Sequence, residues 1–403
     1  MHGVPDPSVP WLDLPREHPF GLQTLPYGSF RTAPGAPARV GVAVGDDVLD
    51  LTAVSRRLLG RYKRLFAGGD LDLLLAAGPA VWREVRASLE GWFRDPSVRD
   101  AVESALRPVA GVILELPFSV ADFVDFYASE HHARNLGRLL RPGTEPLLPN
   151  RKSLPVGYHG RAGTVVVSGT PVVRPHGQWR ADDGSVVLAP TRRLDLEAEV
   201  GFVVGTPSTL GRPVPMSAFA EHVFGVCLVN DWSARDVQAW EYVPLGPFLG
   251  KSFATSISPW ITPLAALADA RVPLPGQDPE PLDYLRVAEP AGYAIDLEVV
   301  VNGSVVSRPP YASMYWSPAQ MLAHMTVNGA SLRTGDLYGS GTISGPERDQ
   351  RGSFLELSWG GAEPFTLDDG STRTYLQDGD TVTLRATAGA ITLGEVAGTI
   401  TPR

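Results

Sequence analysis

The run LDLEAEV, residues 194–200, constrains the fold of this chain more than any other stretch. Successive side chains of a β-strand point to opposite faces, so a strand here places Asp195, Glu197 and Glu199 on one face and four apolar residues on the other. Carboxylates two residues apart on one face lie roughly 7 Å apart, and no Lys or Arg is interleaved to relieve their repulsion. Two interpretations follow: a half-solvated antiparallel strand with an acidic outer face, or a site for a hard cation such as Ca²⁺ or Mg²⁺, which selects carboxylate oxygens.

The composition excludes several classes of protein. The chain has 403 residues, 43% hydrophobic and 20% charged, which suffices for two domains with a sizeable core. Its 42 Gly and 37 Pro favour a turn-rich, strand-dominated architecture, and its net charge of −9 argues against nucleic acid or an anionic membrane as a partner. No apolar stretch approaches the roughly 20 residues of a membrane span, and we expect no signal peptide in MHGVPDPSVPWLDLP. Cys227 is the only cysteine and lies in the apolar run GVCLVN, so we expect a buried thiol in a reducing compartment and a cytoplasmic protein.

The chain divides into two parts near residue 117. The first part, residues 1–117, contains a predicted hairpin over 39–51, helical spacing of apolar residues from 51 to 106, and a short apolar strand between Pro108 and Pro117. The second part, residues 118–403, is rich in predicted strands bounded by Gly, Pro and Asp: 164–167, 186–188, 194–204, 223–229, 295–301, 354–359 and 381–385. One clear helix is predicted after Ser317, where Ser-Pro-Ala-Gln forms a capping box, and it ends near Gly329.

Two glycine-rich stretches do not indicate phosphate binding. Residues 246–252 resemble a P-loop, but they are one residue short between the glycines and run into ATSISP instead of a helix. Residues 339–345, GSGTISG, lack the strand–turn–helix context of a dinucleotide site. We expect the second stretch to be a loop in which backbones approach closely.

The first of three polar segments is VDFYASEHHARNLG. A helix here places Asp125, Ser129 and His132 on one face and ends at Gly137. A lone histidine is more often structural than catalytic, and HExxH is absent, so a His-ligated transition metal is the weaker metal hypothesis.

The second polar segment follows an apolar strand that ends at Asp231. A helix after that strand places four different polar groups on one face: Asp231, Arg235, Gln238 and Tyr242. The alternative is a solvated helix face. Lys251 and Thr255 follow a Pro/Gly-rich turn that can fold back toward Asp231, and Lys251 is one of only three lysines among 35 basic residues, which suggests a need for a compact ammonium.

The third polar segment is the predicted strand over 354–359, which carries Glu356 in an apolar setting. A buried acid needs a partner, and His132 would serve if it lies nearby. The alternative is a glutamate that faces solvent on an edge strand.

Several long, contiguous stretches carry a family resemblance. They are DFYASEHHARNLG, LLPNRKSLPVGYHGRAGTVVVSGTPVVRPHGQ, LDLEAEVGFVVG, VNDWSARDVQAWEYVPLGPFLGKSFATSISPW, and GSGTISGPE with GSFLELSWGG. In order, and over nearly the whole chain, they resemble the fumarylacetoacetase (fumarylacetoacetate hydrolase) family. The resemblance implies a mainly β (α+β) fold, with an N-terminal SH3-like barrel domain over 1–117 and a C-terminal mixed β-roll domain over 118–403 that forms a homodimer. It also implies hydrolysis of a carbon–carbon bond in 4-fumarylacetoacetate, which gives fumarate and acetoacetate at the end of tyrosine and phenylalanine breakdown.

The resemblance further implies roles for individual residues. The family's calcium ligands match Asp125, Glu197, Glu199 and Asp231. Its second ion position, for Mg²⁺ or a monovalent cation, matches Asp231, Lys251 and Thr255 with nearby backbone oxygens. The general base matches His132, oriented by Glu356, and the groups that stabilise negative charge match Arg235, Gln238 and Lys251. The substrate-contacting positions match Tyr127, Arg141, Tyr158, Gln238, Tyr242 and Thr342. The chain departs from the family pattern at Glu130, His131 and Ala254.

The chemistry of these residue types agrees with that reaction. Cleavage of a 1,3-diketone by water needs a base, hydrogen-bond donors for an oxyanion, and stabilisation of an enolate, for which a carboxylate-bound divalent cation can chelate the dicarbonyl. Two alternatives remain open. One is a related 1,3-dicarbonyl or acylpyruvate hydrolase, or a decarboxylase/dehydratase of the same superfamily, which keeps the cation site without needing the His132–Glu356 pair. The other is a catalytically silent, ion-stabilised binding protein.

Overall fold

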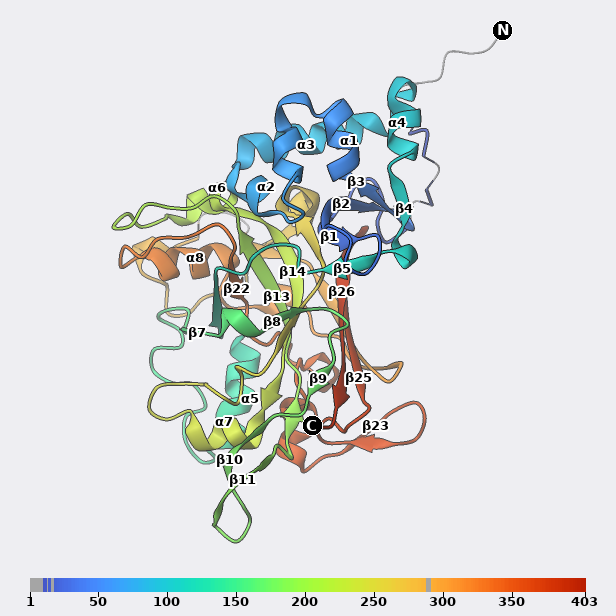
Figure 1. Ribbon diagram of the computed structural model, residues 1–403. Helices are drawn as coiled ribbons and strands as arrows, with labels where there is room; N and C mark the ends of the chain where they lie inside the picture. Colours follow the sequence, from blue (N-terminus) through green and yellow to red (C-terminus); the bar gives the residue numbers. More distant parts are fainter. Residues whose placement is uncertain (1–9, 13, 16–17, 288–290) are drawn as a thin grey trace.

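The computed structural model describes residues 10–12, 14–15, 18–287 and 291–403, and it shows a mixed α/β protein in which sheets dominate (Figure 1). The first nine residues, which belong to the segment expected to lack a signal peptide, lie outside this description. Among the described residues, none of the helices combines the length and apolar character needed to cross a membrane.

The first part of the chain consists of short strands under a layer of helices (Figure 1). Its strands are β1 (Tyr27–Arg31), β2 (Arg39–Val44), β3 (Asp47–Asp50), β4 (Leu106–Pro108) and β5 (Ile113–Glu115). Its α-helices are α1 (Leu51–Leu58), α2 (Asp72–Ala76), α3 (Pro79–Trp92) and α4 (Arg99–Glu103). The predicted hairpin, the helical stretch and the short strand between Pro108 and Pro117 are therefore confirmed.

The central sheet runs through both parts of the chain. Its strands follow the order β4-β3-β2-β1-β17-β14-β13-β22-β6-β7. The later members are β6 (Asp122–Phe126), β7 (Gly157–His159), β13 (Ala198–Val204), β14 (Val223–Asp231), β17 (Trp260–Pro263) and β22 (Asp336–Gly339). Strands β8 (Val165–Val167) and β16 (Thr255–Ile257) extend it from β14. Because β1 pairs with β17, and the strand pairs of the described residues never return to their starting strand, the expected SH3-like barrel is not confirmed.

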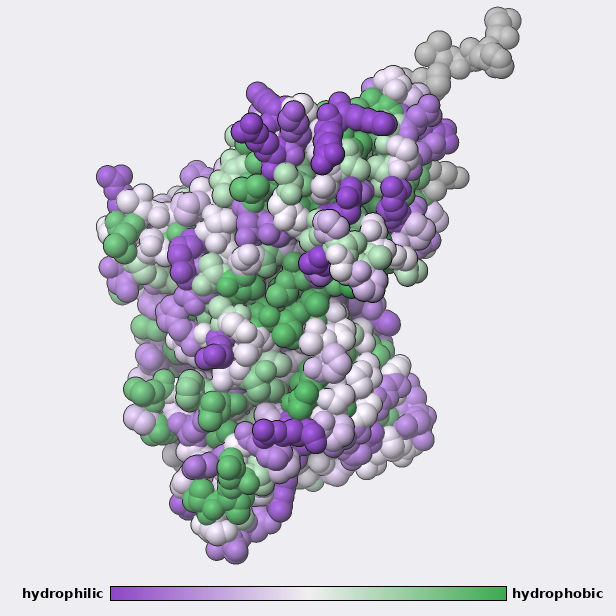
Figure 2. Space-filling view, viewed as in Figure 1, coloured by the Kyte–Doolittle hydropathy of each residue, from purple (hydrophilic) through white to green (hydrophobic). Residues whose placement is uncertain are grey.

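A second sheet of five strands lies beside the first, in the order β21-β20-β25-β26-β9. Its strands are β9 (Val172–Val173), β20 (Asp296–Val301), β21 (Ser304–Ser307), β25 (Thr381–Ala388) and β26 (Ile391–Thr401). The other strands of the part of the chain that the structure describes form four two-stranded pairs: β10 (His176–Arg180) with β11 (Val186–Pro190), β12 (Leu194–Asp195) with β15 (Ser233–Ala234), β18 (Arg271–Val272) with β19 (Gly292–Tyr293), and β23 (Phe365–Thr366) with β24 (Thr372–Arg373). Apolar side chains gather on the surface over the β10–β11 hairpin, which projects from the lower end of the molecule (Figure 2).

Five α-helices lie in the described residues of the second part. They are α5 (Glu130–Leu140), α6 (Phe219–His222), α7 (Arg235–Glu241), α8 (Pro318–Thr326) and α9 (Phe354–Leu357). The capping box at Ser317 is confirmed, since its hydroxyl accepts from Gln320 N while the Gln320 side chain accepts from Ser317 N. The predicted strands at 164–167, 186–188, 223–229, 295–301 and 381–385 also form, with small differences in their ends.

The LDLEAEV run is extended and alternating, but both of its faces are buried. Its apolar residues pack into the main hydrophobic core, and its acids are no more than 5% exposed. The half-solvated alternative is therefore wrong. The predicted strand also breaks into β12 and β13, because Glu197 between them bridges Ser353.

Three further local predictions are wrong. Residues 354–359 form helix α9 and a 3-10 turn instead of a strand, since the hydroxyl of Ser353 caps Glu356 N. Asp125 and His132 do not share a helix, because Asp125 lies in β6 and α5 begins only after its N-cap, Ser129. Helix α5 also runs past Gly137, where a Cβ atom would lie 2.0 Å from the carbonyl oxygen of Pro146.

Candidate functional site

Four carboxylates meet on the central sheet. Asp125 lies on β6, Glu197 just before β13, Glu199 on β13, and Asp231 at the end of β14. One oxygen from each lies within 4.8 Å of the others. The strand order brings them together, because β14 and β13 are neighbours and only β22 separates β13 from β6.

Gly339 makes room for this cluster. It lies on β22, paired with Asp125 on one side and with Gly201 on the other. A Cβ atom at this position would lie 2.6 Å from Oε2 of Glu199 and 3.4 Å from Oδ1 of Asp125. The close approach of backbones expected for residues 339–345 is found at Gly341, where a Cβ atom would lie 2.1 Å from the carbonyl oxygen of Phe126. Gly339 itself ends β22, and its lack of a side chain admits two carboxylates.

Two basic side chains neutralise part of the cluster. Nζ of Lys251 lies 2.5 Å from Glu197 and 2.6 Å from Asp231, and Arg235 lies 2.7 Å from Glu197. Burial raises the pKa of Glu197, but Lys251 and Arg235 outweigh burial and hold that pKa well below its usual range. Thr255 donates to Asp231 over 2.8 Å.

Glu199 and one oxygen of Asp125 have no hydrogen bond from a basic side chain or other donor to neutralise them among the described residues. Both oxygens of Glu199 and Oδ1 of Asp125 are buried with no hydrogen-bond partner among the described residues. Burial, followed by the repulsion of neighbouring acids, raises the pKa of both groups, and burial also raises the pKa of Asp231. Uncompensated buried carboxylates are costly, so these oxygens fit a hard divalent cation as their missing partner.

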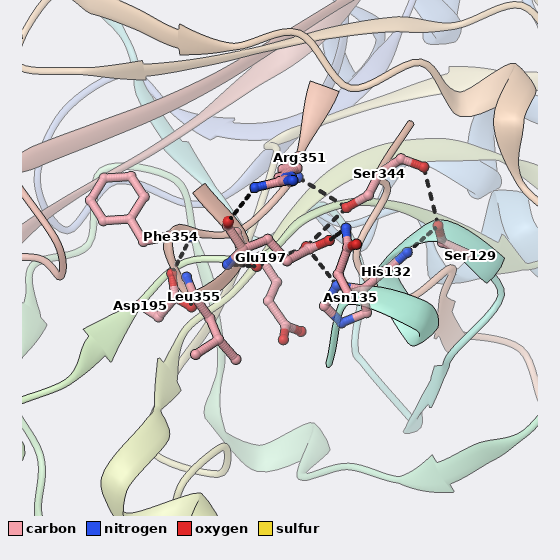
Figure 3. A network of polar contacts seen from close by, with 12 residues as sticks. Ser129, His132, Asn135, Asp195, Glu197, Ser344, Arg351, Phe354 and Leu355 are labelled. Atoms are coloured by element: carbon pink, nitrogen blue, oxygen red, sulfur yellow. Dashed lines mark hydrogen bonds and ion pairs between the residues drawn. The ribbon is translucent and has the colours of Figure 1, made fainter. Parts of the chain in front are cut away.

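A second group of contacts joins His132 to Glu356. Oε2 of Glu356 lies 2.6 Å from Nδ1 of His132, and the same carboxylate accepts from Asn135, Ser344 and Ser353 over 2.8 to 2.9 Å (Figure 3). Burial raises the pKa of Glu356, but the interaction with His132 and these hydrogen bonds bring it below its usual value. A charged Glu356 holds the proton of His132 on Nδ1, which leaves Nε2 free to accept a proton.

Helix α7 supplies further donors. Arg235 is buried on its first turn, and its Nη1 donates to the amide oxygen of Gln238 over 3.2 Å. Nη2 of Arg235 is buried with no partner among the described residues, so it is available to a ligand. Asp231, by contrast, ends β14 and does not lie on this helix. The prediction that Asp231 shares a helix face with Arg235, Gln238 and Tyr242 is therefore wrong for Asp231.

The expected substrate-contacting residues fall into two sets. Tyr127 lies edge-on to His132 with ring centroids 5.2 Å apart, Tyr158 pairs with Asp125 between β7 and β6, and the hydroxyl of Thr342 is buried without a partner in the described residues. The other set lies further out. Arg141 follows α5 and donates to the carbonyl of Pro146, and Tyr242 is 41% exposed at the end of α7.

The departures from the family pattern leave the cluster intact. Glu130 forms ion pairs with Arg134 at 2.7 Å and with Lys152 at 3.4 Å, which neutralise its charge at the start of α5. His131, next to it, is half-buried, and burial lowers its pKa. Ala254 packs into the main core just before β16.

Sequence reasoning missed several residues of the site. Asn135, Ser344 and Ser353 hold Glu356, and the buried guanidinium of Arg151 lies 4.4 Å above the Tyr127 ring. Burial lowers the pKa of Arg151 to about 10. Of the three residues that hold Glu356, only Ser353 lies close to it in the sequence, three positions away. Ser344 and Asn135 are 12 and 221 positions away, so no local pattern indicates their contacts.

Buried carboxylates suited to a divalent cation, beside a histidine oriented by a glutamate, define a class of enzymes that combine an ion with a general base. The family described as fumarylacetoacetate hydrolase C-terminal matches residues 122–401, and the fumarylacetoacetase N-terminal family matches residues 23–117. The chain therefore belongs to the fumarylacetoacetate hydrolase family, as the sequence resemblance implied.

Known relatives are similar to this chain over most of its length. Fumarylacetoacetases from Rattus norvegicus and Arabidopsis thaliana are 44% and 42% identical, and each alignment covers 91% of this chain and 91% of the relative. Among solved structures, a fumarylacetoacetate hydrolase from Exiguobacterium antarcticum aligns with a TM-score of 0.56 and 18% identity over 94% of this chain and 100% of the other. A maleylpyruvate hydrolase from Sphingobium aligns with a TM-score of 0.51 and 17% identity, again over 94% of this chain and 100% of the other. At these identities the two structures support the fold.

Proposed function

We propose that this chain is a hydrolase that cleaves the carbon–carbon bond of 4-fumarylacetoacetate to give fumarate and acetoacetate, the last step of tyrosine and phenylalanine breakdown. The observation that carries this proposal is the similarity to fumarylacetoacetases over 91% of the chain, at 40 to 44% identity. The geometry of the site supports it, because a base, its orienting acid, three donors and a set of cation ligands lie together.

His132 acts as the general base. Glu356 accepts the Nδ1 proton, so Nε2 can take a proton from the attacking water and later return it to the carbon leaving group. Asn135, Ser344 and Ser353 keep Glu356 charged and fixed, which in turn fixes the ring of His132.

Arg235, Gln238 and Lys251 stabilise the negative charge that develops on the substrate. Nη2 of Arg235 has no protein partner among the described residues, and Lys251 uses two of its three N–H donors on Glu197 and Asp231. The remaining donors are buried, where a hydrogen bond to an oxyanion is worth more than in water.

The cation ligands in this proposal are Asp125, Glu197, Glu199 and Asp231. A divalent cation, Ca²⁺ or Mg²⁺, would supply Lewis-acid stabilisation of the enolate of the diketone when bound there. A second position, for Mg²⁺ or a monovalent ion, would use Asp231, Lys251 and Thr255 with nearby backbone oxygens. Tyr127, Arg141, Tyr158, Tyr242 and Thr342 would contact the dianionic substrate, for which Arg141 and the tyrosine hydroxyls are suitable donors.

Assembly and location complete the proposal. We infer a cytoplasmic homodimer in which the two parts of the chain correspond to an SH3-like domain and a β-roll domain. Exposed apolar side chains on the segment after α7, including Val243, Leu245 and Phe248, support an interface between copies. The buried Cys227 supports a reducing compartment.

The decisive experiment is incubation of the purified chain with fumarylacetoacetate, with and without a chelator. Loss of the diketone absorbance with formation of equimolar fumarate and acetoacetate supports the proposal. Turnover of an acylpyruvate but not of fumarylacetoacetate would assign the chain to a related activity instead. Tight binding without product at saturating Mg²⁺ or Ca²⁺ would indicate a silent binding protein.

A further inference from the structure

Asp195 shares the acidic alternation of Glu197 and Glu199, but it does not belong to the carboxylate cluster. Its side chain is fully buried. Oδ1 accepts from Leu196 N at 2.8 Å and Phe354 N at 2.7 Å, while Oδ2 accepts from Leu355 N at 3.0 Å and from Nε of Arg235 at 2.8 Å. Four donors satisfy the acceptor capacity of a carboxylate, so Asp195 has no oxygen left for a cation or a substrate.

The first contact of Asp195 is with the beginning of α9. The N–H groups of Phe354 and Leu355 belong to the first turn of this short helix, where backbone N–H groups have no partner within the helix. The next residue of α9 is Glu356, the acid that orients His132. In Figure 3, Asp195 lies beside Phe354 and Leu355 on one side of the network, with His132 on the other.

The second contact is with Arg235. Asp195 engages Nε, and Glu197 engages Nη1 over 2.7 Å, so two acids fix two positions on the planar guanidinium. Burial lowers the pKa of Arg235, but the attraction of Asp195 and Glu197 raises it above its usual value, which keeps the group charged. The direction in which Nη2 points is therefore set by these two carboxylates.

We propose that Asp195 is a positioning residue that fixes the donor Nη2 of Arg235 relative to the His132–Glu356 pair. One carboxylate joins two residues that are 40 and 160 positions away in the chain: the donor Arg235 itself, and Leu355, which directly precedes Glu356. The proposal rests on the proposed function, because it assigns the donor and the base to the same reaction. This role explains why Asp195 lies in the same run as the cation ligands Glu197 and Glu199 although it does not bind the cation.

The test is a double-mutant cycle between Asp195→Asn and Arg235→Ala. The amide keeps the shape of the side chain, and its oxygen can still accept from the backbone of α9, but it no longer carries the charge that holds Arg235. We expect kcat of Asp195→Asn to fall on the order of 10²-fold, as for the loss of one oxyanion donor. In the Arg235→Ala background the same change should lower kcat by less than about threefold, because coupled residues are not additive.

The control variant is Asp236→Asn. Asp236 lies next to Arg235 on α7, and its carboxylate is also well hydrogen-bonded, to Thr191, Arg192 N and Val237 N. Because Asp236 holds no group of the site, we expect kcat to stay within about twofold of the unaltered chain. Equal losses in both Asp→Asn variants, or an Asp195→Asn effect that is undiminished in the Arg235→Ala background, would overturn the proposal.

Structure and folding provide the remaining readouts. A crystal structure of Asp195→Asn should show Arg235 or the start of α9 displaced, and an unchanged arrangement of both would overturn the proposal even if the unaltered chain does not act on fumarylacetoacetate. Lack of turnover by the unaltered chain contradicts the proposed function instead. If Asp195→Asn does not fold, Asp195→Ser, a smaller side chain with one acceptor oxygen, takes its place. Failure of both to fold would overturn the positioning role and assign Asp195 to folding.

Discussion

Nδ1 of His132 lies 2.6 Å from Oε2 of Glu356, although the two residues are 224 positions apart in the chain. Both side chains are almost completely buried, so this contact is shielded from the screening that weakens surface ion pairs. The carboxylate has three other donors, which means that its position does not depend on the histidine alone. The side chain of His132 can therefore be removed without leaving the Glu356 carboxylate unpaired.

We expect His132→Ala to abolish turnover, with kcat lowered by at least about 10³-fold, because no other described base takes the proton at this place. The fold should persist, since Asn135, Ser344 and Ser353 still satisfy Glu356. Steady-state kinetics and a thermal melt measure the two effects. Glu356→Gln, which keeps the shape but removes the charge, should give an intermediate loss. Near-normal turnover of His132→Ala would eliminate the mechanism.

Gly339→Ala should weaken divalent cation binding. The added Cβ would lie 2.6 Å from Oε2 of Glu199, and the carboxylate must move away from the cluster to relieve this contact. Isothermal titration with Mg²⁺, Ca²⁺ or Mn²⁺ should show affinity reduced by about tenfold or more, as is typical when the support of a metal ligand is disturbed. Gly163→Ala is the matched control, because a Cβ there meets no atom within 4 Å. Unchanged affinity in Gly339→Ala would show that Glu199 does not bind the ion.

Part of this site could be predicted from sequence because it depends on local rules. The alternation of LDLEAEV follows from the period of a strand, and it separates the acids from the apolar residues whatever lies around them. The capping box at Ser317 is local in the same way. The burial of the acidic face is not local, since side chains from distant segments, such as Asp125 and Lys251, lie against these acids.

The helix at 354–357 shows why the rest could not be predicted. FLELSW has apolar alternation typical of a strand, yet the backbone of Phe354 and Leu355 donates to Asp195, which lies 159 and 160 positions away. A tertiary contact therefore overrides the local pattern. Periodicity groups Asp195 with Glu197 and Glu199, and only its hydrogen bonds from the backbone of Phe354 and Leu355 distinguish it from them. The roles of individual residues came from the family resemblance, which encodes tertiary contacts that a single sequence does not display.

Cys227 should be unreactive in the folded chain. Burial raises the pKa of its thiol to about 12, so at neutral or mildly alkaline pH the group is a protonated thiol that solvent does not reach. A thiol reagent should label less than one tenth of the native chains over about an hour, and all of them in denaturant. Lys152, which is partly exposed, offers a comparison by amine labelling, since it should react without denaturant. Rapid native labelling of Cys227 would show that β14 opens readily.

Removal of the divalent cation should change stability in a pH-dependent way. Burial and mutual repulsion raise the pKa of Asp125 and Glu199 in the cation-free chain above their unfolded values near about 4. The folded chain then keeps protons that the unfolded chain has lost, so these groups make the cation-free chain less stable as pH rises through their folded pKa values. Glu197 has a lowered pKa and stays charged over this range, so it does not reverse the sign.

A bound cation must displace those protons, so its affinity and its stabilising effect should increase with pH. Thermal melts from about pH 5 to about pH 9, with excess Mg²⁺ or Ca²⁺ and with EDTA, measure the difference in Tm between the two conditions. We expect this difference to widen as pH rises. In Glu199→Gln, which removes one charge from the cluster, the widening should be smaller, whereas Glu347→Gln on the exposed surface should behave like the unaltered chain. A difference in Tm that is constant or narrows with pH would mean that the cation binds elsewhere than on these protonated carboxylates.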